Sequence, residues 1–489
     1  MLQTLKNAWN TKEIRNKILF TLFILLLYRI GTVIPVPFVE ANSFASTFSG
    51  TILDYMNTLS GGALGTATLF ALGVSPYINA SIIIQLLAVV FPKLGELAKT
   101  DKSKMNLITR ITTVILAIVT AIGYYFLLKN GGALTNAATP GENKLYWLYA
   151  IVIVACYCAG ASVIMWLAER INEKGIGNGI SLILFANIIS SIPSFVYNLV
   201  NLVIGTYQYS DKAWLFGIIS TLFAVILVAA VVALIIFVIY ITGSERRISV
   251  RYAKQIRGRK MYGGQSQNLP IKLNMTGVMP IIFASSIVSL VPTILALCGV
   301  TSQTKGFWGG VSRFLASDGV FYPVSLFILI IAFAYFYTQI TFDPIEVANR
   351  IKNQGGTIAG IRQGRPTSDF IRNVLNKVTL VGALFLGIVA VLPVIAGPHC
   401  IQHIIQWIMD GSDYAKQAVE YNALYKDTGE YMYKYYADSI TSTISSSVQN
   451  LTSTFTFGGT TLLIMVGVVL ETFRELEAQL TMRNYKGFL

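Results

Sequence analysis

Residues 52–91 read ILDYMNTLSGGALGTATLFALGVSPYINASIIIQLLAVVF, and this stretch decides the fold class. Its second part, residues 70–91, is an apolar run long enough to cross the roughly 30 Å hydrocarbon core of a membrane as a helix. Its first part, residues 52–69, is too short to cross and is interrupted by glycines. Irregular backbone at membrane depth is tolerated only inside protein or beside a water-filled cavity. The segment is therefore either a re-entrant helix that dips into the membrane or a helix in a surface loop.

Nine further apolar runs of similar length indicate a multi-pass membrane protein. The 489-residue chain is 54% hydrophobic and 12% charged, whereas roughly 25% of the residues of a soluble protein are charged. This composition excludes an ordinary soluble enzyme and, because the hydrophobicity is high, a disordered chain. We predict an all-α polytopic membrane protein with ten transmembrane helices, and the even number places both termini on one side. The nine further spans are residues 18–36, 108–128, 146–168, 179–204, 213–241, 273–298, 322–341, 378–396 and 456–472.

The net charge of +14 lies mostly on one side of the predicted membrane. The side with the termini carries 28 of the 37 Lys and Arg residues, and the opposite side carries 8. Basic residues accumulate in cytoplasmic loops, so we expect both termini in the cytoplasm. Half of the 28 lie in two loops, residues 242–272 and 342–377. These loops either mark topology and contact anionic lipid headgroups, or they form a docking platform for a large cytoplasmic partner. Their charges could also bind RNA, for instance ribosomal RNA.

The predicted spans contain almost no charge, which bears on the kind of transport they support. They hold no Asp, Glu, Lys or His away from their ends, and Arg29 is the clear internal charge. Ion-coupled transporters usually bury carboxylates or histidines as relays. An ion-coupled secondary transporter is therefore only the alternative function. Arg29 either snorkels to the outer interface or pairs with a buried acceptor.

Sequence signatures of enzymes and cofactor sites are missing. The chain has no phosphate-binding P-loop motif, and its four cysteines include no C-x-x-C pair. His399 and His403 are four residues apart, but the glutamate of the zinc-protease motif is absent between them. We expect no enzymatic activity, no cofactor and no metal site. The long external stretch 397–455 is expected to form a small helical cap or to lie partly disordered.

Neutral polar side chains do occur inside three of the spans. Such residues bond helices reversibly, at roughly 0.6 kcal/mol per contact, which suits an interface that opens. Ordinary static helix packing is the alternative explanation. These residues are Asn79 and Gln85 in the second span, Thr112 and Thr113 in the third, and Ser285 and Ser286 in the seventh.

Several long motifs identify the family of this chain. Residues 17–37 read KILFTLFILLLYRIGTVIPVP, residues 165–188 read MWLAERINEKGIGNGISLILFANI, residues 360–371 read GIRQGRPTSDFI and residues 457–471 read FGGTTLLIMVGVVLE. Together with residues 59–87, these motifs resemble those of the SecY family of protein-translocation channels. The resemblance covers most of the chain. The stretches outside it are residues 129–145, 205–212, 299–321 and 397–455.

The resemblance implies an architecture and a function. Two pseudo-symmetric five-helix halves, residues 1–204 and 205–489, would surround an hourglass pore that unfolded polypeptide crosses. Residues 52–69 correspond to the family's plug, which favours the re-entrant form. Membrane segments would leave sideways, between helices 2 and 3 of one half and helices 7 and 8 of the other. The implied function is a protein-conducting channel that translocates unfolded secretory polypeptides across the membrane.

The resemblance also implies roles for individual residues. The pore ring would comprise Val74, Ile78, Ile180, Leu184, Ile282 and Ile464, and the plug would include Asp54, Tyr55, Met56, Leu59, Gly61 and Gly62. The six neutral polar residues named above would belong to the lateral gate. The docking residues would be Arg246, Arg247, Arg251, Arg257, Arg259, Lys260 and Arg362. At Ala359 and Gln363 the family commonly has proline, so the stiffness of this loop is left open.

The resemblance further implies partners and a location. The partners would be SecE-like and SecG-like small membrane subunits, the SecA motor ATPase and the ribosome, with signal peptides and nascent polypeptides as substrates. Anionic lipids would contact the basic loops. The chain would be a multi-pass protein of the bacterial plasma (inner) membrane.

Overall fold

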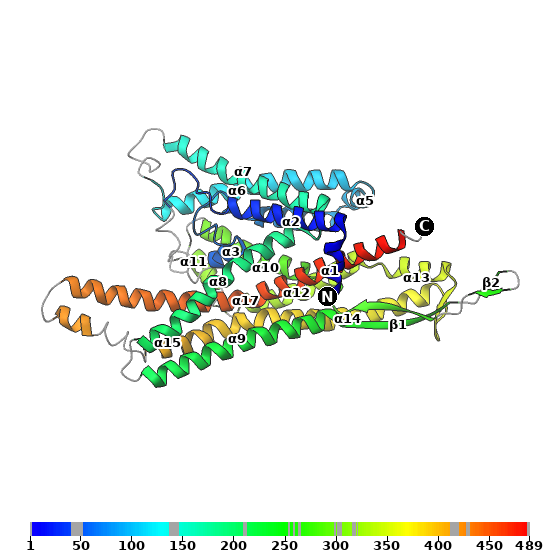
Figure 1. The fold of residues 1–489 in the computed structure, drawn as a ribbon. Coiled ribbons are helices and arrows are strands. Elements are labelled where there is room, and N and C mark those ends of the chain that lie inside the picture. Colours follow the sequence, from blue (N-terminus) through cyan, green and yellow to red (C-terminus); the bar gives the residue numbers. More distant parts are fainter. Residues whose placement is uncertain are drawn as a thin grey trace.

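The apolar runs of the sequence form long helices that pack into a bundle, with a small β-structure at one end (Figure 1). The computed structural model describes residues 2–40, 52–135, 146–208, 213–252, 255–257, 260–262, 266–297, 300, 306–314, 319, 321–410, 420–426 and 431–486. Each of the ten predicted spans overlaps one helix. These helices are α2 (Lys12–Gly31), α4 (Ser75–Val90), α6 (Lys102–Asn130), α7 (Tyr146–Lys174), α8 (Gly179–Gln208), α9 (Ala213–Gly243), α10 (Met279–Leu297), α12 (Phe321–Thr341), α14 (Arg365–Ala396) and α17 (Tyr431–Lys486). Within the predicted spans, α2 ends before residues 32–36, and α4 and α10 begin after residues 70–74 and 273–278.

Shorter helices connect the long ones. They are α1 (Leu2–Asn10), α3 (Ile52–Leu59), α5 (Pro92–Thr100), α11 (Phe307–Phe314), α13 (Pro344–Asn353), the π-helical turn η4 (Gly397–Ile401) and α15 (Gln402–Asp410). The two chain ends lie at the same end of the bundle as the strands and α5, whereas α11, α15 and the start of α17 lie at the opposite end (Figure 1). This arrangement agrees with the side that the basic residues predict for the termini.

Six helices of the described chain are long and apolar enough to cross a membrane, judged by length and composition. A seventh span is possible if α4 and α5, which meet at an angle of 116°, count as one. The chain is therefore a mostly helical, multi-span protein, and the number of ten spans stays a prediction. The part of α10 whose side chains are described, Met279–Leu295, is shorter than the 18 residues that this criterion requires. α2 carries Arg15, Lys17 and Arg29 along its length, so neither helix meets the criterion.

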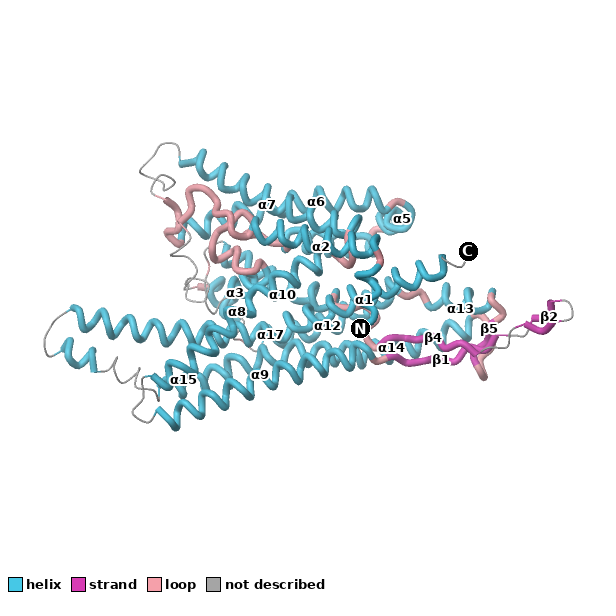
Figure 2. The backbone as a smooth tube through the Cα atoms, viewed as in Figure 1, coloured by secondary structure: helices cyan, strands magenta, loops and turns pink. Residues whose placement is uncertain are grey.

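The two basic loops contain β-structure, so the prediction of an all-α chain was wrong in this region. β1 (Glu245–Tyr252) pairs with both β4 (Ser266–Lys272) and β5 (Gly356–Ile358) in an antiparallel sheet of order β4-β1-β5. A second pair, β2 (Gln255–Arg257) and β3 (Lys260–Tyr262), extends beyond it (Figure 2). The inward side chains of β1, such as Ile248 and Val250, pack on a buried cluster that includes residues of β4, β5 and α14. Loops 242–272 and 342–377 thus form one structural unit.

The described part of the external stretch 397–455 is helical, as in the predicted cap, but its last residues belong to a long helix. It continues from α14 through η4 and α15, and α17 begins at Tyr431. Because α17 has 56 residues, it measures about 84 Å at 1.5 Å per residue. This helix contains the predicted tenth span and extends well beyond the bundle at its N-terminal end (Figure 1).

Candidate functional site

The residues predicted to form a pore ring come together in one buried apolar cluster. Five of the six expose only 1% to 5% of their surface: Val74 2%, Ile78 5%, Leu184 2%, Ile282 4% and Ile464 1%. Ile180 is half-buried and packs against the same cluster. We call these six residues the apolar ring.

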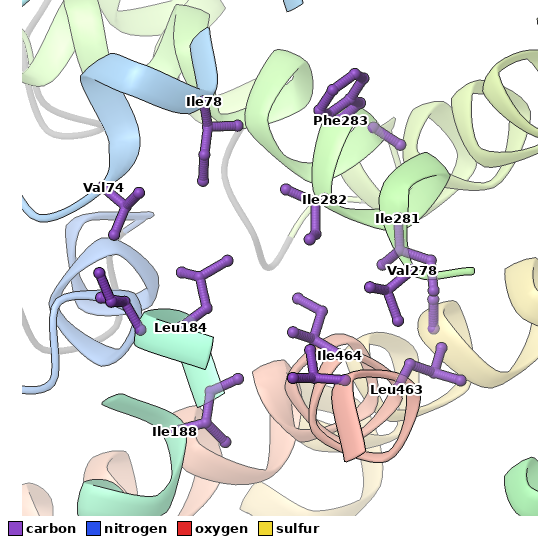
Figure 3. Packing of buried hydrophobic residues seen from close by; sticks show 14 of the residues in the cluster. Val74, Ile78, Leu184, Ile188, Val278, Ile281, Ile282, Phe283, Leu463 and Ile464 are labelled. Carbon is purple, nitrogen blue, oxygen red and sulfur yellow. The ribbon is translucent and has the colours of Figure 1, made fainter. Parts of the chain in front are cut away.

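Four helices position the apolar ring. Val74 caps the N-terminus of α4 and Ile78 lies one turn later, because Pro76 fixes the start of that helix. Leu184 comes from α8, Ile282 from α10 and Ile464 from α17, and their side chains converge on a common centre (Figure 3). Ile188, one turn after Leu184 on α8, also reaches this group. Sequence reasoning missed Ile188, although its i, i+4 spacing from Leu184 is a usable signal.

The apolar ring offers no polar atom to an ion. Its members are branched aliphatic side chains, and an aliphatic constriction excludes water and ions by dewetting. The same side chains contact any extended segment without requiring a particular sequence, because apolar contact is non-directional. The arrangement therefore suits a seal that closes around a variable chain.

Beside the apolar ring lies α3, the short helix from the segment predicted to be a plug. It contacts α8, α10 and α17, so it lies inside the bundle. Leu59 packs against the cluster that contains the ring, and Met56 packs against a second buried cluster. Asp54 and Tyr55 also belong to α3, but their side chains lie outside the described residues. After α3 the chain reverses at Gly61 and Gly62, which both adopt positive φ.

Hydrogen bonds hold the chain that returns from α3 to α4. The Asn57 side-chain oxygen accepts from the Gly65 amide at 2.8 Å, and the Ser60 hydroxyl accepts from the Leu64 amide at 3.1 Å. The hydroxyl of Tyr124, on α6, donates to the Leu64 carbonyl. The hydroxyl of Tyr157, on α7, donates to the Ala67 carbonyl at 3.4 Å. The return segment is thus fixed to α6 and α7, whereas α3 itself packs against α8, α10 and α17.

A cavity of about 680 Å³ opens between helices of the two predicted halves. Its walls come from α4 and α6 on one side and α10 on the other, and Met56, Leu59 and four members of the apolar ring also line it. Three of the predicted gate residues, Asn79, Ser285 and Ser286, line this cavity. Thr120 and Asn130 of α6 line it as well, and sequence reasoning missed them.

The other predicted gate residues divide into two kinds. The side-chain oxygen of Gln85 accepts a hydrogen bond of 2.5 Å from the hydroxyl of Tyr337, so it joins α4 to α12. Thr112 and Thr113 instead donate to carbonyls of their own helix, at Ile108 and Thr109. Of these three, only Gln85 bridges the predicted gate. Its partner Tyr337 was not predicted.

The predicted docking arginines lie on the unit formed by the two basic loops. Arg246, Arg247 and Arg251 belong to β1 and are exposed, and Arg247 pairs with Glu245 at 2.7 Å. Burial and the nearby Arg474 lower the pKa of Lys272, at the end of β4, below its usual value. Three further predicted residues are Arg257 in β2 and Lys260 in β3, whose side chains lie outside the described part, and Arg259, which lies outside it altogether.

Arg362 lies on an exposed turn that the structure braces from two directions. The hydroxyl of Thr367 donates to the Arg362 carbonyl at 2.8 Å. The side-chain amide of Gln363 donates to the Gly356 carbonyl at 3.1 Å, which ties the turn to β5. Because β5 pairs with β1, Arg362 belongs to the same unit as the arginines of the first loop.

Comparison with known proteins gives a consistent family. The sequence model of SecY matches residues 68–409. The chain is 37% identical to the protein translocase subunit SecY of Mycobacterium tuberculosis over 505 aligned residues, and 36% identical to that of Streptomyces coelicolor over 502. Both alignments cover 100% of each chain.

Solved structures with the same fold are more distant in sequence. A structure described as a protein conducting channel matches with a TM-score of 0.57 and 18% identity, over 95% of this chain and 92% of the other. Sec61 in the canine ribosome-channel complex matches with a TM-score of 0.54 and 16% identity, over the same shares. The full-length relatives and the family model agree, and the chain belongs to the SecY family of protein translocase subunits.

Proposed function

We propose that the chain is a protein-conducting channel in which the apolar ring is the constriction and α3 is the plug. The observation that carries this proposal is the convergence of ring side chains from α4, α8, α10 and α17. Directly beside them lies α3, a short helix that is not part of any predicted span. As a SecY-family translocase subunit, the chain is a channel and not an enzyme, so the energy for transport comes from outside it.

The closed and open states follow from the chemistry of the ring. With α3 in place, the aliphatic side chains of the ring exclude water from the constriction, so ions have no hydrated path through it. A translocating polypeptide displaces α3 and takes its place inside the ring, which then contacts the backbone and side chains of the substrate. Because the contacts are non-directional, chains of any sequence pass.

We further propose that ten spans form two halves, residues 1–204 and 205–489, that separate at a lateral gate. The cavity between α4, α6 and α10 supports this boundary, since it opens next to both the ring and α3. Signal peptides and membrane segments would enter the cavity and leave into lipid. Bacterial relatives and the excess of basic residues at one end support a location in the bacterial plasma membrane, with both termini in the cytoplasm.

The basic unit formed by the two loops is proposed to receive the partners. A SecA-like motor ATPase or a ribosome would dock on it, SecE-like and SecG-like subunits would complete the complex, and anionic lipids would contact its edge. The solved Sec61 structure comes from a ribosome-channel complex, which supports the ribosome as one partner. Exposed arginines of β1 and the Arg362 turn supply the charge.

A crosslinking experiment tests the channel proposal against the alternative, an ion-coupled secondary transporter. A stalled secretory chain that carries a photoprobe is expected to label Ile78, Ile180 or Ile282, because an inserted polypeptide must pass the ring. The control is a stalled chain of a cytosolic protein without a signal sequence. Labelling confined to the cytoplasmic loops would rule out a channel and leave only a docking role.

The hydrogen bond between Tyr337 and Gln85 gives a prediction for the gate. Tyr337→Phe removes the donor and is expected to favour the open gate by about threefold to fivefold, the worth of one such bond. Lipid-exposed crosslinking of a stalled membrane segment measures the open fraction. Tyr335→Phe is the matched control, because the Tyr335 hydroxyl donates to the Asn376 carbonyl within the same half. Equal effects of the two substitutions would contradict the bridging role of Tyr337.

A further inference from the structure

The C-terminal end of α3 is bonded both to its own turn and to the channel wall. The last carbonyls of a helix have no partner within the helix and need one elsewhere. The Met56 carbonyl accepts from the Ser60 amide at 2.9 Å, and the Asn57 carbonyl accepts from the Gly62 amide at 2.8 Å. The final carbonyl, that of Leu59, accepts instead from the side chain of Asn187 at 2.7 Å. One bond from the wall therefore completes the end of α3.

Asn187 is placed to act on the plug and the ring together. It is fully buried on α8, directly before Ile188 and three residues after Leu184. Its amide nitrogen donates both to the Leu59 carbonyl and to the hydroxyl of Tyr28, at 2.9 Å. Tyr28 is itself fully buried on α2 and stacks on Phe70. The amide is thus oriented by a side chain of α2.

Arg29, the internal charge that the sequence left unexplained, points to the same place. A Cβ atom placed on Gly61 would lie 2.8 Å from the Arg29 Nη1, 2.8 Å from the Asn187 Oδ1 and 3.1 Å from the Ser190 hydroxyl oxygen. Gly61 also has φ +69°, so only glycine fits there without strain. The guanidinium consequently lies at the C-terminal end of α3, where the helix dipole favours a cation.

Two polar atoms at this contact are buried without a hydrogen-bond partner among the described residues. They are the Nη1 of Arg29 and the Oδ1 of Asn187. Such atoms destabilise the arrangement that buries them. When α3 leaves, water can enter the vacated space and hydrate both atoms. The contact therefore combines a bond that holds α3 with a feature that favours its release.

We propose that Asn187 and Arg29 form a latch that positions the plug in the closed channel. The latch rests on the proposed function, because it requires α3 to be a plug that moves. Asn187 donates to the last carbonyl of α3. The positive charge of Arg29 stabilises the negative, C-terminal end of the α3 dipole. Gly61, which has no side chain, lets both side chains approach. Arg29 is a positioning residue in this scheme, and neither snorkelling nor substrate contact is needed to explain it.

The test removes the donor of Asn187 and measures the closed state. Asn187→Leu keeps a side chain of similar size and is expected to raise the resting ion conductance of reconstituted vesicles about fivefold, the factor that corresponds to one hydrogen bond. Met56→Cys, in a chain whose natural cysteines are replaced by serine, reports plug position. Its labelling by a water-soluble thiol reagent should accelerate by a similar factor. Ser191→Ala is the matched control, since that hydroxyl bonds the Ile188 carbonyl of its own helix.

A second variant keeps the test decisive if the leucine substitution prevents assembly. Asn187→Ala removes the amide donor without adding a charge beside Arg29, and it is expected to increase conductance and labelling in the same direction. Unchanged conductance and labelling in an assembled variant that still translocates would overturn the latch and leave the channel intact. If a stalled polypeptide that carries the photoprobe labels none of Ile78, Ile180 and Ile282 in the unsubstituted channel, the proposed function is refuted, and the latch with it.

Discussion

Replacing Ile282 and Ile464 with serine is expected to raise the resting ion conductance of the closed channel by about a hundredfold. The two residues face each other across the apolar ring from α10 and α17 (Figure 3). An aliphatic side chain of this size disfavours water by at least about 1.5 kcal/mol relative to a small polar one. Since about 1.4 kcal/mol of barrier corresponds to a factor of ten in rate, the two substitutions together predict two factors of ten.

The control places the same substitutions on the same helices but away from the ring. Val291 of α10 and Val469 of α17 are both exposed on the surface of the bundle, so Val291→Ser with Val469→Ser should leave the conductance unchanged. Single-channel or vesicle-efflux recordings without substrate measure the difference. A double ring variant that conducts no better than the control pair would show that α3 alone seals the channel.

The long helices could be predicted from the sequence because their physical cause is local. A run of about 20 apolar residues inside a membrane satisfies most of its backbone within one helix, and each of the ten runs lies largely on one. Residues 32–36, 70–74 and 273–278 belong to predicted runs but lie outside the helices. The boundaries were less predictable: α17 begins at Tyr431, where Tyr, Ser and Thr residues give no apolar signal. The pairing of β1 with β5 was missed because β5 has only three residues and lies about a hundred residues further along the chain. β1 itself alternates, with Ile248 and Val250 buried and Ser249 and Arg251 exposed, which is a usable strand signal.

Some residues of the candidate site could be predicted from the sequence or from the resemblance, and others could not. The apolar ring came from the resemblance, since an isoleucine that lines a pore and one that packs in a core look alike in a sequence. Thr112 and Thr113 show the limit of reasoning from polarity, because a threonine in a helix can bond its own preceding turn. Tyr337 and Asn187 were missed because their roles depend on partners far away in the chain, Gln85 and Leu59.

The turn around Arg362 shows how a departure from a family pattern can be compensated. Glutamine at position 363 lacks the fixed backbone of proline, which left the stiffness of this loop open. In the structure its side-chain amide donates to the Gly356 carbonyl, so the turn is tied to β5 by a hydrogen bond. Thr367 holds the Arg362 carbonyl from the other side. The backbone that presents Arg362 is therefore constrained independently of its side chain.

Because the backbone around Arg362 is held by other residues, reversing the charge of the Arg362 side chain tests its role in docking without disturbing the turn. Arg362→Glu is expected to weaken binding of a SecA-like motor to the reconstituted channel by about thirtyfold, the effect of losing a central arginine of an interface. Motor-driven translocation should fall with it, whereas membrane insertion should remain, since the bonds from Gln363 and Thr367 do not involve the side chain. Co-flotation of the motor with channel vesicles measures binding, and protection of a secretory substrate from protease measures translocation.

Lys352→Glu is the control that distinguishes an effect of the Arg362 position from an effect of the changed net charge. Lys352 is exposed near the end of α13, within the same basic loop, and its reversal changes the net charge by the same amount. If the loop acts only as a diffuse basic surface, the two variants should weaken binding equally, and added salt should abolish both effects. If Arg362 makes a specific contact, its reversal should exceed that of Lys352 by at least tenfold, and Arg362→Lys should restore only part of the affinity, because lysine lacks the planar fork of arginine. Normal binding and translocation by Arg362→Glu would exclude this turn from the docking surface.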